Sequence, residues 1–197
     1  RIRAIQWEYG DVPIVVAAGD GGPPVVRPNP PPDTPGVASY RLLGATRLAD
    51  GRPFVMGMES LTGGSHFRTL AYTYDPSTIS WTAHKPLDPD ASDHPAGFTN
   101  QLWDAAQGPD GRVFSVGRYH YIRQGSHYYG ALIESWDGAS WSLHPIPQEL
   151  TEGWNSQLYG TAAFSPTGAI HAAGELNPPE SFDDQTLVLY TEPDVSG

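Results

Sequence analysis

Aromatic and charged side chains gather in a few polar stretches between the apolar segments of this chain. Aromatic rings at the edge of a binding surface can stack on a sugar or on a protein side chain. Neighbouring cations, amides and carboxylates can hydrogen-bond to the same ligand. The same rings could instead pack locally on their own scaffold. The residues predicted to bind a ligand in this way are Tyr119, Tyr121, Arg123, His127, Tyr128, Glu152 and Trp154.

Carboxylates suggest two further kinds of chemistry. Asp88, Asp90 and Asp93 space oxygen atoms as calcium loops do, although the glycine and the distal glutamate of an EF-hand loop are missing. A solvated acidic loop is the alternative, and no other cofactor is indicated. Two loop carboxylates could also act as acid and base in glycoside hydrolysis, for which Asp104, Glu152 and Asp183 are the candidates.

Two histidines recur in equivalent places, within Gly64-Ser65-His66 and Gly125-Ser126-His127. Zinc requires three or four converging ligands, and the sequence does not bring that many together. Inheritance through a repeat explains these histidines as well as a metal site does.

Composition limits the classes of partner. The 197 residues carry a formal net charge of −11, which argues against nucleic acid because phosphate binding needs a basic surface. No run approaches the roughly 18 apolar residues of a membrane helix, so membrane insertion is not expected. Cysteine is absent, which excludes disulfides and thiolate metal sites.

An internal repeat defines the fold. Three turn glycines, Gly51, Gly111 and Gly168, lie 60 and 57 residues apart, and each follows a segment rich in small residues. Each turn precedes a short apolar strand that closes on another glycine: Gly57, Gly117 or Gly174, again 60 and 57 residues apart. The strand pairs around Gly51 and Gly111 are each followed by a second pair of strands. The repeat therefore predicts four-stranded units of about 60 residues.

Side-chain size changes in the same direction within each unit. The first strand carries small residues such as Gly44-Ala45 and Ala105-Ala106, whereas the third and fourth carry Tyr72, Trp136 and Trp141. Four-stranded sheets arranged radially need thin inner strands and bulky outer ones. We therefore predict an all-β protein with the architecture of a β-propeller.

Two sequences carry a resemblance to known repeats. The stretch Tyr74-Asp75-Pro76 followed by Trp81 resembles the kelch repeat, and Trp136-Asp137-Gly138 followed by Trp141 is similar to the repeats of bacterial secreted propellers. Kelch units close their second strand with two glycines, whereas one stands here. The resemblance implies a propeller that binds partners and implies no particular reaction.

About three units fit into the chain. An N-terminal strand pair and a proline-rich loop would occupy residues 1–38, with Ile2 to Tyr9 and Ile14 to Ala17 as the strands, and the units would occupy 39–99, 100–155 and 156–197. Propellers need about four or more blades. The sequence therefore indicates a partial ring, completed either by a second copy in a six-bladed homo-oligomer or by a longer chain.

Loop lengths separate the two ends of the predicted sheets. Turns within strand pairs are short, whereas the connections at the other end are long, including Gly19 to Ala38, Glu59 to Arg68 and Arg118 to Gly130. Loops that a rigid scaffold presents together often carry function. We expect a secreted or cell-surface module that binds a protein or a glycan with this long-loop face; a glycoside hydrolase and a structural subunit of an oligomer or filament are the alternatives.

Overall fold

The computed structural model describes residues 14–16, 25–27, 37–61, 67–87, 100–123, 125–147, 155–162, 171–177 and 185–190. Every regular element in these ranges is a β-strand, and the strands pair antiparallel. The predicted all-β class is therefore confirmed. In these same ranges no helix has the length and apolar character needed to cross a membrane.

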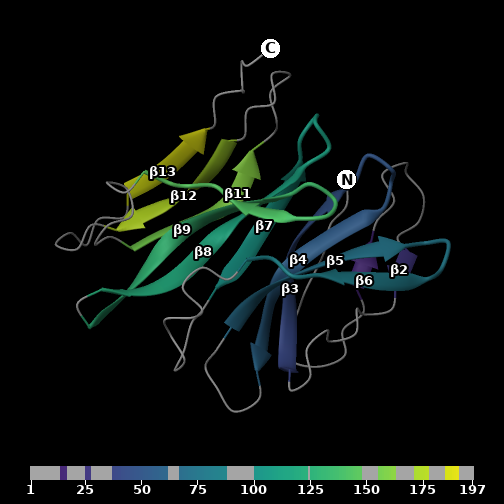
Figure 1. The fold of residues 1–197 in the computed structure, drawn as a ribbon, viewed down its shortest axis with the longest axis horizontal. Coiled ribbons are helices and arrows are strands. Elements are labelled where there is room, and N and C mark those ends of the chain that lie inside the picture. Colours follow the sequence, from purple (N-terminus) through teal and green to yellow (C-terminus); the bar gives the residue numbers. More distant parts are fainter. Residues whose placement is uncertain are drawn as a thin grey trace.

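Three sheets follow one another along the chain, and in each of them the spatial order of the strands equals their order in sequence (Figure 1). The first contains β3 (Val37–Arg47), β4 (Pro53–Leu61), β5 (Phe67–Asp75) and β6 (Ser80–His84). The second contains β7 (Gln101–Gln107), β8 (Val113–Arg123), β9 (Ser126–Trp136) and β10 (Trp141–Leu143). The third contains β11 (Asn155–Ala162), β12 (His171–Asn177) and β13 (Gln185–Tyr190).

Part of the N-terminal segment that was predicted to be loop is a strand. Strand β1 (Ile14–Val16) pairs with β2 (Val25–Arg27), which lies inside the stretch predicted to be a long loop. The β-branched pair Val25-Val26 explains why a short strand forms there despite the surrounding prolines. The other predicted partner, Ile2 to Tyr9, lies outside the described residues.

The first strands of the three sheets, β3, β7 and β11, are called the inner strands here. They share one irregularity that the sequence did not reveal. Pairing between the first two strands of each sheet shifts by one residue at Leu43, Trp103 and Tyr159, which stand directly after the equivalent leucines. Each shift is a β-bulge, which bends the strand and changes the direction in which side chains point. The bulged strands are those at the inner edge of each sheet.

Glycine is required at the closing positions because of where they lie relative to these bulges. Gly57, Gly117 and Gly174 lie opposite Leu42, Leu102 and Leu158, at the residue that precedes each bulge. A Cβ atom at any of the three would overlap a backbone carbonyl oxygen of the inner strand, that of Arg41, Gln101 or Gln157. Any side chain at these positions would force the two strands apart.

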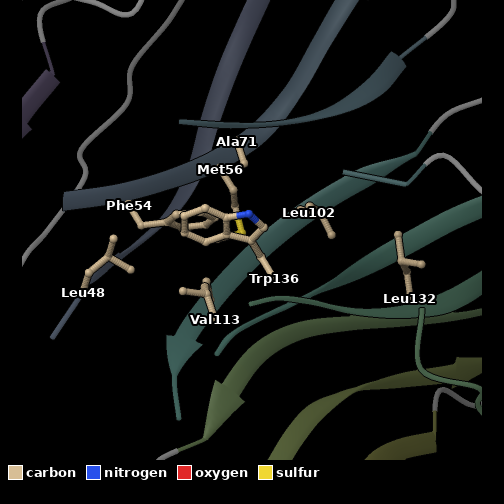
Figure 2. Packing of buried hydrophobic residues seen from close by; sticks show 9 residues of the cluster. Leu48, Phe54, Met56, Ala71, Leu102, Val113, Leu132 and Trp136 are labelled. Atoms are coloured by element: carbon tan, nitrogen blue, oxygen red, sulfur yellow. The ribbon is translucent and has the colours of Figure 1, made fainter. Parts of the chain in front are cut away.

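Large side chains fill the space between the first and second sheets. Phe54 of β4 stacks on Trp136 of β9 with ring centroids 5.4 Å apart, and Met56, Leu102 and Leu132 complete the same cluster (Figure 2). Nearer the inner edge the backbones almost touch, because a Cβ at Gly44 would lie 2.6 Å from the carbonyl oxygen of Trp103. The predicted change from small to large side chains therefore matches the spacing of these two sheets.

The short turns at the other end of the sheets are satisfied locally. Gly51 and Gly111 adopt φ values of 87° and 86°, and their N–H groups donate to the carbonyls of Leu48 and Gly108. In the turn after β9, the Asp137 carboxylate accepts from the N–H groups of Ala139 and Ser140. These acidic side chains shape turns, as aspartates commonly do.

Candidate functional site

The predicted loop Arg118 to Gly130 is instead a long hairpin, and this corrects the sequence interpretation. Strands β8 and β9 remain paired as far as Arg123 and Ser126. Side chains from the starts of two inner strands cap free N–H groups of this hairpin. The Asn100 side chain accepts from the N–H of His120, and the Asn155 side chain accepts from that of Tyr129. Backbone hydrogen bonds therefore hold most of this segment as strand.

One face of the hairpin carries three of the predicted binding residues. Tyr121 and Tyr128 are cross-strand partners whose rings stack at a centroid distance of 5.4 Å. Tyr119 covers Gly130 and packs against the core between the first and second sheets. The local-packing alternative thus describes Tyr119, whereas Tyr121 and Tyr128 remain half-buried.

The opposite face of the hairpin carries a different set of side chains. His120 Nε2 and His127 Nδ1 lie 2.9 Å apart in a hydrogen bond, with His120 buried and His127 exposed. Tyr129 lies beside His120, and Arg118 lies on the same face, two residues before His120 in β8. Because successive side chains of a strand alternate, the structure separates His127 from the tyrosines with which the sequence grouped it.

Two of the bulge residues form a stacked pair at the inner edge. The rings of Trp103 in β7 and Tyr159 in β11 have centroids 5.0 Å apart and planes inclined by 23°. Half of the Tyr159 surface is exposed. The two rings pack on each other, and the exposed surface of Tyr159 is open to a ligand.

Polar side chains join this pair from the neighbouring strands. Arg118 Nη1 donates to Gln157 Oε1 at 2.9 Å, and the Gln157 amide nitrogen donates to Tyr159 Oη and to Glu175 Oε1. The guanidinium of Arg118 also lies over the ring of Trp103. We call this group the inner-strand cluster; it comprises Trp103, Arg118, Gln157, Tyr159 and Glu175.

Ionisation states in the cluster follow from burial and from the hydrogen bonds. Partial burial, followed by hydrogen bonding to Glu175, raises the pKa of Tyr159 to about 12, so its hydroxyl remains protonated at neutral pH. Burial lowers the pKa of Arg118, although an arginine remains charged. The cluster therefore offers a cation, a carboxylate, an amide and a phenol beside two rings.

Other predicted residues have varied positions. Asp104 lies next to Trp103 in β7, where its carboxylate accepts from the N–H of Ala105. Arg123 ends β8, and its side chain is not described. Within the described residues no three histidines, aspartates or glutamates gather as metal ligands. The residues Asp88, Asp90, Asp93, Glu152, Trp154 and Asp183 lie outside the described ranges.

Sequence reasoning missed Gln157 and Glu175 and assigned no binding role to Trp103 or Tyr159. The available signal was that Trp103 and Tyr159 follow the equivalent leucines Leu102 and Leu158 in two repeats. Only the bulge, which changes the direction of their side chains, shows that they also face a neighbouring inner strand.

Comparison with known proteins gives distant structural similarity and no match in sequence. No protein-family model and no curated protein matches the sequence. Among solved structures, an endo-arabinase from Bacteroides thetaiotaomicron superposes with a TM-score of 0.44 at 12% identity. The superposition covers 92% of this chain and 64% of that enzyme chain, so this chain spans less than two thirds of its length.

Proposed function

We propose that this chain recognises a glycan at the inner-strand cluster. The observation that carries the proposal is the Trp103–Tyr159 stack, which joins two inner strands and leaves half of Tyr159 exposed. Sugar rings have apolar faces that pack on aromatic rings, and their hydroxyls need donors and acceptors at the edge of the ring. Arg118, Gln157 and Glu175 supply both kinds of group.

We further propose that the sheets are consecutive blades of a β-propeller, exposed outside the cell. Support comes from the meander order of the strands and from the close approach of inner strands at Gly44. The bulky contact between Phe54 and Trp136 away from that edge gives the sheets the wedge-like spacing that a radial arrangement needs. The cluster would then lie at the inner edge of the sheets.

The test is a screen of the intact chain on immobilised oligosaccharides, repeated with Trp103→Ala and Tyr121→Ala. Removing a stacked ring should cost on the order of 1 kcal/mol, or roughly fivefold in affinity. We expect that loss for Trp103→Ala and no change for Tyr121→Ala, because Tyr121 points to the other face of the hairpin. Binding to no glycan, or equal losses in both variants, would contradict the proposal.

A glycoside hydrolase is the second candidate, because Glu175 belongs to the cluster and a second carboxylate, Asp104, adjoins it. Asp104 Oδ2 lies 3.8 Å from the position that a Cβ at Gly160 would occupy, and Glu175 pairs with Gln157 across β11 and β12. Acid–base hydrolysis needs two such groups on opposite sides of a glycosidic bond. Turnover of chromogenic glycosides that Asp104→Asn abolishes, while glycan binding persists, would favour this candidate.

A further inference from the structure

Arg118 differs from the other arginines whose contacts are visible in the structure. Its guanidinium carbon lies 4.2 Å from the centroid of the Tyr129 ring and 5.2 Å from that of Trp103. Burial between these rings removes water from the charged group and lowers its pKa. A cation placed in this way gains from an anion more than an exposed one does, because less water screens the attraction.

The hydrogen bonds of Arg118 leave one guanidinium nitrogen without a partner. Nη1 donates to Gln157, whereas Nε is buried and has no hydrogen-bond partner among the described residues. Among the described residues no carboxylate lies within ion-pair distance of Arg118. By contrast, Arg52 and Arg112 each pair with an aspartate two residues before them, at 2.7 Å and 2.5 Å.

The one carboxylate of the cluster, that of Glu175, hydrogen-bonds to groups other than Arg118. Glu175 accepts from Gln157, and its hydrogen bond to Tyr159 helps to keep that phenol protonated. Glu175 therefore balances the local charge from a distance without occupying the edge of the guanidinium. A planar carboxylate matches that edge, since two parallel N–H groups of an arginine can donate to its two oxygens.

We propose that Arg118 receives the carboxylate of a hexuronate, so that the glycan recognised at the inner-strand cluster is an acidic one. The proposal rests on the proposed function. The sugar ring would lie on the exposed surface of the Trp103–Tyr159 stack, and its carboxylate would accept from guanidinium N–H groups that do not donate to Gln157. Because the whole chain has a net charge of −11, a local cation offsets the repulsion that such a ligand would meet.

The experiment compares trimers of galacturonate and of galactose, which differ at C6, by calorimetry on the intact chain. We expect the galacturonate trimer to bind about tenfold more tightly, as one charge-assisted hydrogen bond permits. Arg118→Gln should abolish that preference and Arg118→Lys should retain part of it. Arg112→Gln is the matched control, because it removes the same charge from the turn end of β8 and should leave the preference intact.

The methyl-esterified galacturonate trimer keeps the test valid if Arg118→Gln does not fold, since it removes the charge from the ligand; it should bind like the galactose trimer. Equal binding of charged and neutral trimers to the wild-type chain would overturn the carboxylate proposal and leave glycan recognition standing. Binding of neither trimer, nor of any other oligosaccharide, would contradict both. Binding of hexaglutamate as tight as that of galacturonate would overturn the proposal in favour of an acidic peptide.

Discussion

Arg112 and Arg118 stand six residues apart, just before and within β8, yet they differ in burial and in polar partners. Arg112 is nearly half exposed, and its Nε donates to Asp110 within the same turn. Arg118 is held between the rings of Tyr129 and Trp103 and reaches the third sheet through Gln157. The first arginine is satisfied by its own turn, whereas the second depends on side chains from three other strands.

This difference separates structural charge from charge that is available to a ligand. At the turn end, Asp50 and Asp110 bond to the arginine two residues later, and Asp137 bonds to the backbone of its own turn. At the other end, the bulges bring Trp103 and Tyr159 together beside a guanidinium whose buried Nε has no hydrogen-bond partner among the described residues. Substitutions at one end of the sheets can therefore be compared with matched substitutions at the other end.

The largest effect is expected from an alanine at a closing glycine. Gly117→Ala places a Cβ against the carbonyl oxygen of Gln101 and forces β7 and β8 apart. We expect a loss of about 3 kcal/mol in the free energy of unfolding. Gly111→Ala is the control at the turn end, where a Cβ meets nothing within 4 Å and only the φ of 86° opposes it. It should cost about 1 kcal/mol, measured by urea unfolding; equal losses would contradict the bulge account.

The ionisation of Tyr159 tests the connectivity of the inner-strand cluster. NMR titration of labelled tyrosines should show Tyr159 titrating at about 12. Glu175→Gln removes the carboxylate that accepts from the hydroxyl, so the pKa of Tyr159 should fall toward the ordinary value of 10.0 while remaining above it because of burial. A Tyr159 pKa that does not respond to Glu175→Gln would show that the two groups are not joined in solution.

A smaller effect is expected at the turn end. The ion pair between Asp110 and Arg112 is solvent-exposed. Arg112→Ala should therefore cost less than about 1 kcal/mol, and the cost should shrink as salt is added. Thermal unfolding at low and high ionic strength measures this, and a large cost independent of salt would mean that Arg112 is not the passive reference that we take it to be.

The smallest effect concerns acid. Hydrogen bonds from the N–H groups of Ser140 and Ala139 lower the pKa of Asp137 below 3.8 in the folded chain. A carboxylate with a lowered folded pKa stabilises the fold above its unfolded pKa, and this contribution is lost as pH falls through the folded value. Asp137→Asn should thus flatten the decline in stability below pH 3.8, as acid titration of the unfolding midpoint would show; an unchanged decline would contradict this.

The repeat made the strand pairs of this fold predictable, whereas the bulges and the contacts that depend on them were not predictable. The spacing of Gly57, Gly117 and Gly174 marked the strand pairs, and the second pair that follows marked the four-stranded units. The bulges were invisible because an extra residue in one strand changes no residue type. For the same reason the meeting of Trp103 with Tyr159, which depends on those bulges, could not be read from the sequence.

The hairpin shows a second limit. Its polar and aromatic composition resembles a loop, and backbone pairing together with the side-chain caps from Asn100 and Asn155 explains how it remains strand. Once it is strand, Tyr121 and His127 must lie on opposite faces. Predicted binding residues that seemed contiguous were thus divided by the alternation of the pleat.

The most direct test of the central claim is to observe the indole N–H of Trp103 by NMR while a bound oligosaccharide from the screen is titrated into the chain. Ligand at the inner-strand cluster should shift the Trp103 signal with a saturable dependence and leave those of Trp81 and Trp141, which pack on Tyr74 and Phe54, unchanged. A ligand that binds while the Trp103 signal stays still would place recognition elsewhere on the molecule and contradict the account.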